Sequence, residues 1–134
     1  MTRRPRVYVA APYEDAALVR EVHERLRLHR AHATSEWARN ARGADDLASL
    51  PRERRRALAL ANDFAVSTSD AVMVLARPGA GGEMFCEARL AIACHVPVFW
   101  VGREILSTSR EGVSVCEDVN DALLRVGQLR TESR

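Results

Sequence analysis

Residues 71–102 read A-V-M-V-L-A-R-P-G-A-G-G-E-M-F-C-E-A-R-L-A-I-A-C-H-V-P-V-F-W-V-G, and this stretch decides the fold. It holds an apolar strand at 71–75, a glycine-rich loop at 78–82, a helix from Glu83 to about 94 and a second apolar strand at 96–101. Continuous apolar strands are typical of a parallel sheet that is covered by helices on both faces. The stretch therefore predicts a β-α-β crossover within an α/β fold.

The rest of the chain continues this alternation of strands and helices. A first strand is expected at 6–11, ending at Pro12, and an amphipathic helix follows over 14–29, where apolar residues recur at three- and four-residue steps. We further expect a weak strand at 31–35, a loop at 36–50, a helix from Pro51 to about 67, a short strand at 113–116 and a final helix from Asp118 to about 129. These elements predict one domain over 1–134, with a doubly wound parallel sheet of about five strands in three α/β/α layers.

Composition limits the classes of function. The net charge is only +2, although the chain has 20 basic residues, all of them arginine, so charge does not indicate a nucleic-acid partner. No run approaches the roughly 20 apolar residues of a membrane span, and the first residues lack a signal-peptide core. The three cysteines show no C-x-x-C spacing, which favours free thiols in a reducing compartment. We therefore expect a cytoplasmic protein without a membrane partner.

The glycine-rich loop is the first candidate binding element. Gly79, Gly81 and Gly82 allow backbone N–H groups to approach a ligand closely, and the following helix amino terminus favours an anion. A phosphate is therefore a plausible ligand, while a loop that merely turns explains the glycines equally well. The chain has no Walker lysine and no G-x-G-x-x-G motif, so it predicts neither a P-loop nor a dinucleotide fingerprint.

Glu83 and Glu87 are a candidate pair of chemical groups. They are four residues apart at the start of one helix, so both carboxylates lie near one face and near the positive end of the helix dipole. Paired acids can hold different pKa values and divide the roles of nucleophile and acid. The alternative interpretation is ordinary solvated surface, because acids are common in first turns.

Four short segments carry a family resemblance: V-Y-V-A-A-P-Y at 7–13, S-D-A-V-M-V-L at 69–75, G-G-E-M-F-C-E-A-R-L-A at 81–91 and V-P-V-F-W-V-G at 96–102. In this order they resemble the nucleoside 2-deoxyribosyltransferase-like family, which includes deoxynucleoside 5'-monophosphate N-glycosidases. The resemblance covers most of the chain and is weakest at 37–50. It implies a flavodoxin-like, Rossmann-like sheet and a homodimer or higher homo-oligomer, in which a neighbouring subunit completes the sugar pocket.

The implied activity is cleavage or transfer at the N-glycosidic bond of a (deoxy)ribonucleoside or its 5'-monophosphate. Glu87 falls on the family's nucleophile, which forms a covalent glycosyl-enzyme, and Tyr8 falls on the tyrosine that helps to place it. The acid that handles the leaving base corresponds to Asp63 or to its neighbour Asn62. The expected catalytic residues are therefore Glu87, Asp63 and Tyr8.

The chain also departs from the family pattern. Arg89 stands where the family usually has a glycine two residues after its nucleophile, and His95 replaces the glycine before the following strand. These departures keep a second hypothesis open, a non-catalytic nucleotide-binding module of the same fold. A third is an NAD-cleaving glycohydrolase, since such domains also use a glutamate on a related sheet.

Other polar and aromatic residues complete the candidate site. The expected substrate-binding residues are Pro12, Tyr13, Trp37, Asn62, Gly79, Gly81, Gly82 and Glu83. Trp37 follows the second strand and either stacks on a base or packs as a core aromatic. The arginines at 52 and 54–56 are interpreted as a solvated helix face rather than a phosphate patch. The histidines show no metal-ligand spacing with the cysteines or with each other, so we expect no metal. We also expect no cofactor.

Overall fold

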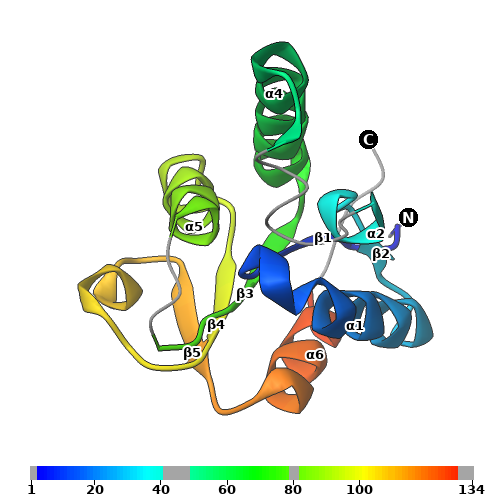
Figure 1. Cartoon of the computed structure of the whole chain (residues 1–134). Coiled ribbons are helices and arrows are strands. Elements are labelled where there is room, and N and C mark those ends of the chain that lie inside the picture. Colours follow the sequence, from blue (N-terminus) through cyan, green and yellow to red (C-terminus); the bar gives the residue numbers. More distant parts are fainter. Residues whose placement is uncertain (1–2, 41–48, 79–81, 130–134) are drawn as a thin grey trace.

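The computed structural model describes residues 3–40, 49–78 and 82–129. These residues form a five-stranded sheet in the order β2-β1-β3-β4-β5, and every neighbouring pair is parallel (Figure 1). The strands are β1 (Arg6–Ala10), β2 (His32–Ala33), β3 (Ala71–Leu75), β4 (Val98–Val101) and β5 (Val113–Cys116). This is the flavodoxin-like strand order, and the expected fold class is confirmed.

Helices cover both faces of the sheet. They are α1 (Ala16–Leu28), α2 (Trp37–Asn40), α4 (Arg52–Thr68), α5 (Glu83–Ala93) and α6 (Val119–Gly127), with short 3-10 helices η1 (Tyr13–Asp15) and η2 (Leu106–Ser109). The helices α1 and α6 contact each other on one face, whereas α5 lies on the other face and α4 packs against α5 (Figure 1). The three-layer arrangement agrees with the expectation from the sequence.

The core follows the apolar pattern of the strands. All five residues of β3 are buried, as are the last four of β1, because helices lie on both sides of these central strands. In α1 the buried residues recur at three- and four-residue steps, at Ala16, Val19, Val22, His23 and Leu26. The expected amphipathic helix is therefore present and packs its apolar face on the sheet.

Some element bounds differ from the expectation. The loop expected at 36–50 contains the short helix α2, while residues 41–48 lie outside the described residues. The strand expected at 96–101 is β4, and it starts at Val98. Val96 is not part of it, because its amide still donates to the Ala91 carbonyl at the end of α5 (2.9 Å). The η2 helix has no counterpart in the expectation.

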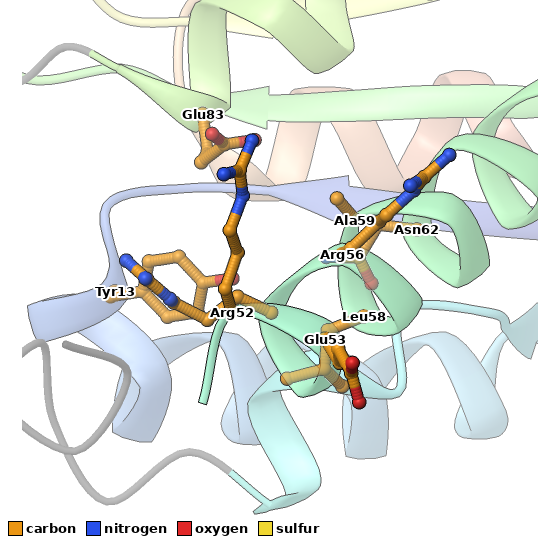
Figure 2. Close-up of a pocket in the computed structure, with 9 residues that line it drawn as sticks. Tyr13, Arg52, Glu53, Arg56, Leu58, Ala59, Asn62 and Glu83 are labelled. Atoms are coloured by element: carbon orange, nitrogen blue, oxygen red, sulfur yellow. The ribbon is translucent and has the colours of Figure 1, made fainter. Parts of the chain in front are cut away.

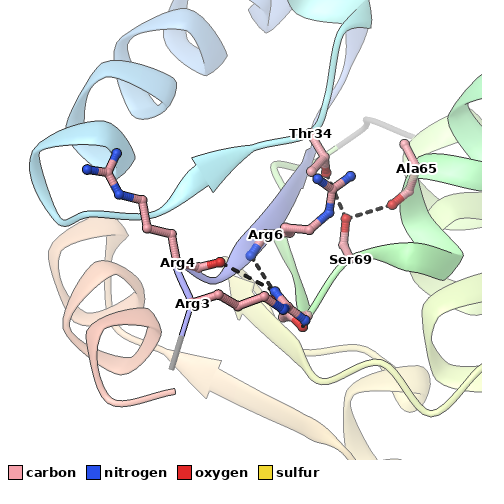
Figure 3. A network of polar contacts seen from close by, with 7 residues as sticks. Arg3, Arg4, Arg6, Thr34, Ala65 and Ser69 are labelled. Carbon is pink, nitrogen blue, oxygen red and sulfur yellow. Dashed lines mark hydrogen bonds and ion pairs between the residues drawn. The ribbon is translucent and has the colours of Figure 1, made fainter. Parts of the chain in front are cut away.

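Polar contacts near Arg3, Arg6 and Ser69 join the amino-terminal ends of β1 and β3 (Figure 3), and Asp70 supplies the carboxylate. Its carboxylate accepts two hydrogen bonds from the Arg3 guanidinium (2.6 and 2.8 Å) and one from the Arg6 amide (2.7 Å). The bond from Arg3 is the main cause that holds the pKa of Asp70 below its usual value. Nearby, the hydroxyl groups of Thr34 and Ser69 are 2.7 Å apart, and Ser69 donates to an α4 carbonyl. This end of the sheet is therefore fixed by buried and half-buried polar contacts.

The opposite, carboxyl-terminal end of the sheet is the end at which ligands bind in this class of fold. The chain leaves β1 toward one edge and β3 toward the other, and ligands bind α/β sheets at such a switch point. Arg77, just after β3, bridges this point by ion pairs to Glu14 and Asp15 (2.9 Å each). At Gly102 the φ angle is +133°, and an added Cβ would lie 2.4 Å from the Ala76 carbonyl oxygen, so the neighbouring strand end requires glycine there.

No helix within residues 3–40, 49–78 and 82–129 is long and apolar enough to cross a membrane.

Candidate active site

A buried tyrosine and a buried carboxyl group form the centre of the site. Tyr8 lies in β1 and is fully buried, and Glu87 lies on the second turn of α5 and is 5% exposed. The helix α5 packs against β1, β3 and β4, which brings the two side chains together. The Tyr8 hydroxyl donates a hydrogen bond to Glu87 Oε2. The carboxyl group is therefore held by a side chain of β1.

Burial controls the ionisation of this pair. Loss of solvent raises the pKa of Glu87 to about 8, and the negative charges of Glu83 and Asp63 act in the same direction. The hydrogen bond from Tyr8 acts against them, since it stabilises the carboxylate. Burial and the Glu87 charge raise the pKa of Tyr8, so its hydroxyl stays a donor. In the free protein Glu87 therefore carries its proton at neutral pH.

A cavity of about 640 Å³ lies between α4, η1 and the start of α5. Neither Tyr8 nor Glu87 lines it, but Glu83, one helical turn before Glu87 on α5, does. Its lining residues are Tyr13, Arg52, Glu53, Arg55, Arg56, Leu58, Ala59, Asn62 and Glu83. In Figure 2 the Arg52 side chain extends from the start of α4 across the cavity in the direction of Glu83. The volume lies within the range of small-molecule sites.

The cavity wall next to β1 is aromatic. Tyr13 is half-buried, and its ring meets that of Trp37 edge to face with centroids 5.0 Å apart. Trp37 itself is only 8% exposed, and its indole N–H donates to the Val9 carbonyl (3.1 Å). Trp37 is thus a packed aromatic that supports Tyr13. Burial raises the pKa of Tyr13, while a hydrogen bond with Asn62 acts in the opposite direction.

Three of the expected site residues line the cavity, and Asp63 lies near the buried pair. Tyr13, Asn62 and Glu83 line the cavity. Asp63 is exposed on α4, and its charge raises the pKa of both Tyr8 and Glu87, so it lies within electrostatic reach of the pair.

Two further expected residues, Pro12 and Gly82, do not line the cavity. Pro12 is buried directly after β1, and Gly82 precedes α5 with a φ angle of +71°. Gly79 and Gly81 lie outside the described residues.

The arginines of α4 are cavity-lining residues that sequence reasoning missed. Arg52, Arg55 and Arg56 are exposed, as expected for a solvated face, yet they also line the cavity. The available signal was helical spacing, since steps of three and four residues lead from these arginines to Ala59 and Asn62 on the same face. The family resemblance indicated Asn62 but not the turns that precede it.

The two departures from the family pattern have clear positions. Arg89 is exposed, whereas Glu87 is buried, because residues two apart on a helix point to different sides. Arg89 therefore does not occupy the space around Glu87. His95 has a φ angle of +59°, in the left-handed region that favours glycine, at the end of α5.

Among the described residues, no group of three His, Cys, Asp or Glu side chains is placed to hold a metal ion.

Comparison with known proteins finds solved structures with a similar fold. No protein-family model matches the chain, and no curated protein matches it in sequence. The chain is similar to the solved structure of the CMP N-glycosidase BcmB of Clostridium botulinum, with a TM-score of 0.56 and 12% identity over 92% of this chain and 99% of that one. It is also similar to a molybdenum cofactor binding protein of the phototrophic bacterium Rippkaea orientalis, with a TM-score of 0.59 and 16% identity over 92% and 96%. These likenesses confirm the α/β fold that the family resemblance implied.

Proposed function

We propose that this protein is an N-glycosidase that cleaves the bond between base and sugar in a nucleoside 5'-monophosphate, with Glu87 as the nucleophile. The observation that carries the proposal is the buried Tyr8–Glu87 pair, one helical turn from Glu83, which lines a cavity together with three arginines. The fold it shares with a CMP N-glycosidase supports the same reaction class.

The reaction requires two steps at the sugar C1' atom. The Glu87 carboxylate attacks C1' while the bond to the base breaks, and an acid gives a proton to the leaving base nitrogen. Water then attacks C1', its proton passes to the group that acted as acid, and sugar 5-phosphate leaves with Glu87 restored as a carboxylate. Tyr8 holds one oxygen of the carboxyl group throughout, which leaves the other oxygen for attack.

The arginines support a substrate that carries a phosphate. Three guanidinium groups line the cavity with only two carboxylates, Glu53 and Glu83. An arginine fork matches the oxygens of phosphate and binds them with charge-assisted hydrogen bonds. A 5'-phosphate between the α4 arginines would direct the sugar toward Glu87, with Glu83 beside the sugar hydroxyl groups.

Asp63 is the proposed acid for the leaving base. It is the carboxyl group of α4 whose charge acts on both Tyr8 and Glu87. Asn62 has an amide in place of an acid and is already bound to Tyr13, so it suits contact with the base or sugar. In this proposal Asp63 is the proton donor and Asn62 is an uncharged hydrogen-bonding group for the substrate.

The helix α4 supports the proposed homo-oligomer. Val66 is its buried residue, while Leu60 and Phe64 are 60% and 69% exposed. They lie four residues apart, with Ala57 and Ala61 on the same stripe, so α4 presents an apolar face to solvent. A second copy that packs its own α4 on this stripe would lie next to the cavity.

Analytical sedimentation of two variants tests this contact. We expect Phe64→Arg to yield a monomer, whereas Leu124→Arg, at an exposed leucine of α6, should leave the dimer intact. A native protein that sediments as a monomer would contradict this contact.

Two other functions use the same geometry. A binding module would hold the nucleotide in the cavity without turnover, and the fold also occurs in a molybdenum cofactor binding protein. An NAD glycohydrolase would use Glu87 on the nicotinamide ribose. Neither requires the α4 arginines to select a terminal phosphate.

The test is base release by the purified protein from nucleosides, their 5'-monophosphates and NAD, followed by chromatography. We expect release from a monophosphate, and a loss of at least about tenfold in kcat/KM for Arg52→Gln/Arg55→Gln on the monophosphate but not on the matching nucleoside. The matched control is Arg103→Gln/Arg110→Gln, which removes two exposed arginines outside the cavity lining. Thermal stabilisation by nucleotides without base release would favour the binding module, and nicotinamide release would favour the NAD reaction.

A further inference from the structure

A second cavity lies at the β2 edge of the sheet and shares no lining residue with the candidate active site. It has a volume of about 420 Å³. Its lining residues are Arg4, Arg20, His23, Glu24, Arg27, Ala31, His32, Ala33 and Arg39. We propose that this cavity binds the phosphate group of a small ligand, with Arg20, Arg27 and Arg39 as its anchors.

One helix face and one strand build the cavity. Arg20, His23, Glu24 and Arg27 recur at three- and four-residue steps, so α1 presents them on a single face. The strand β2 supplies the adjoining wall, and Arg39 reaches the cavity from α2. The helices α1 and α2 thus direct guanidinium groups to one concave place, and Arg4 adds another from the residues before β1.

The charges favour an anion with more than one negative charge. Four arginines line the cavity with Glu24 as the one carboxylate among the lining residues. Arg27 pairs with Glu24, and Arg39 pairs with Glu36 at 2.9 Å, but both pairs are exposed and such pairs contribute little to stability. A phosphate can therefore replace these carboxylates as the partner of both guanidinium groups at small cost.

The remaining donors also suit phosphate oxygens. Arg20 gives one N–H to the Ala38 carbonyl (2.9 Å), and a guanidinium has five N–H groups. The amides of His32 and Thr34 donate to the carbonyls of Pro5, just before β1, and Val7 in β1 (2.8 Å each). By the alternation of a parallel ladder, the amide between them, that of Ala33, points to the open edge. A backbone N–H beside several arginines is a combination typical of phosphate sites.

The floor of the cavity is rigid and neutral. His23 is buried, and its Nε2 lies 2.7 Å from the Ser35 hydroxyl, which also accepts the Val9 amide (3.1 Å). Burial lowers the pKa of His23 to about 4, and the charge of Arg39 contributes. The volume falls in the range of small-molecule sites, which favours a compact phosphorylated compound over a macromolecule.

The test is titration of the full chain with inorganic phosphate, inorganic pyrophosphate and ribose 5-phosphate, followed by calorimetry and by the NMR signals of His23. We expect saturable binding that moves the His23 signals and weakens as salt is added. The compound that binds most tightly distinguishes an inorganic anion from a sugar phosphate. Arg27→Gln/Arg39→Gln should weaken binding at least about tenfold, since two charge-assisted contacts are lost.

Two controls separate this site from other arginines. Arg103→Gln/Arg110→Gln removes the same charge outside both cavities and should leave the affinity within about twofold of native. Arg52→Gln/Arg55→Gln removes arginines of the candidate active site and should leave the His23 response unchanged. The proposal is overturned if His23 does not respond to any of the three compounds, or if all three double variants weaken binding equally.

Discussion

The hydroxyl group of Tyr8 donates a hydrogen bond to the carboxyl group of Glu87 from a position 79 residues away in the sequence, and both side chains are buried. Burial favours the protonated form of Glu87, whereas the bond from Tyr8 favours the carboxylate. The proposed nucleophile is active only as a carboxylate. Its ionisation therefore links the geometry of the site to the pH dependence of catalysis.

The first prediction concerns Tyr8→Phe. Without the hydroxyl donor the pKa of Glu87 rises above its present value of about 8, so the carboxylate needed for attack is rarer at neutral pH. The rising limb of the kcat/KM profile, expected near pH 8 in the native protein, moves to higher pH, and activity at pH 7 falls about tenfold or more. Profiles measured from pH 5 to 10 check this. A variant with reduced activity and an unchanged midpoint would mean that Tyr8 does not tune Glu87.

The second prediction concerns the stability of Glu87→Gln. In the folded chain Glu87 keeps its proton to about pH 8, whereas a glutamate of the unfolded chain loses it near pH 4. The folded state then binds one more proton than the unfolded state between these values, so native stability falls as pH rises through this window. Glutamine has no such dependence. At pH 8 we expect the variant to be more stable than the native protein by about 1–3 kcal/mol, with the difference fading toward pH 4.

Urea unfolding at pH 4, 6 and 8 measures this difference. The control is Glu111→Gln, which removes an exposed carboxylate and should show no gain in stability at pH 8. Equal or lower stability of Glu87→Gln at pH 8 would show that burial does not strain the carboxylate.

The sequence predicts the fold well because the fold depends on patterns that are local. The continuous apolar run of β3 and the stepwise apolar residues of α1 each follow from a short segment, and both are buried as expected. The exceptions are local too. Val96 reads as strand but closes the end of α5, because its amide finds the Ala91 carbonyl.

The site is less predictable because it depends on contacts between distant segments. Helical spacing places Glu83 and Glu87 near one face, yet only the packing of α5 on β1 buries Glu87 and leaves Glu83 at the cavity. The role of Trp37 likewise depends on Val9 and Tyr13, whose contacts with the indole show that it is a packed aromatic. The sequence predicts a solvated face for the arginines of α4. Their helical spacing places them on one face with Asn62, but it does not indicate the cavity wall opposite that face.

The third prediction separates Asp63 from Asn62. If Asp63 gives the proton to the leaving base, Asp63→Asn lowers kcat by about 10²- to 10⁴-fold, the usual contribution of a general acid. Asn62→Ala should act mainly on KM, through lost contact with substrate and Tyr13. A substrate with a good leaving group should restore much of the rate to Asp63→Asn but not to Asn62→Ala. The reverse pattern would assign the polar group of position 62 to the proton transfer.

The fourth prediction concerns the end of α5. His95 holds a φ angle of +59°, which costs a residue with a Cβ about 1 kcal/mol relative to glycine. His95→Gly should therefore stabilise the protein by about 1 kcal/mol in urea unfolding. His95→Ala keeps the strain and should give no comparable gain. A destabilised His95→Gly variant would mean that the imidazole makes contacts that outweigh the strain.

The central claim is that Glu87 forms a covalent bond to the sugar. The most direct measurement is mass spectrometry of the protein after reaction with a 2'-fluoro analogue of its nucleotide substrate, since fluorine destabilises the oxocarbenium-like state and slows hydrolysis of the glycosyl-enzyme. The account predicts a mass increase equal to the fluorinated sugar phosphate, located on the peptide that carries Glu87, and no adduct on Glu87→Gln. Base release that continues unchanged in Glu87→Gln, or an adduct on a different residue, would contradict it.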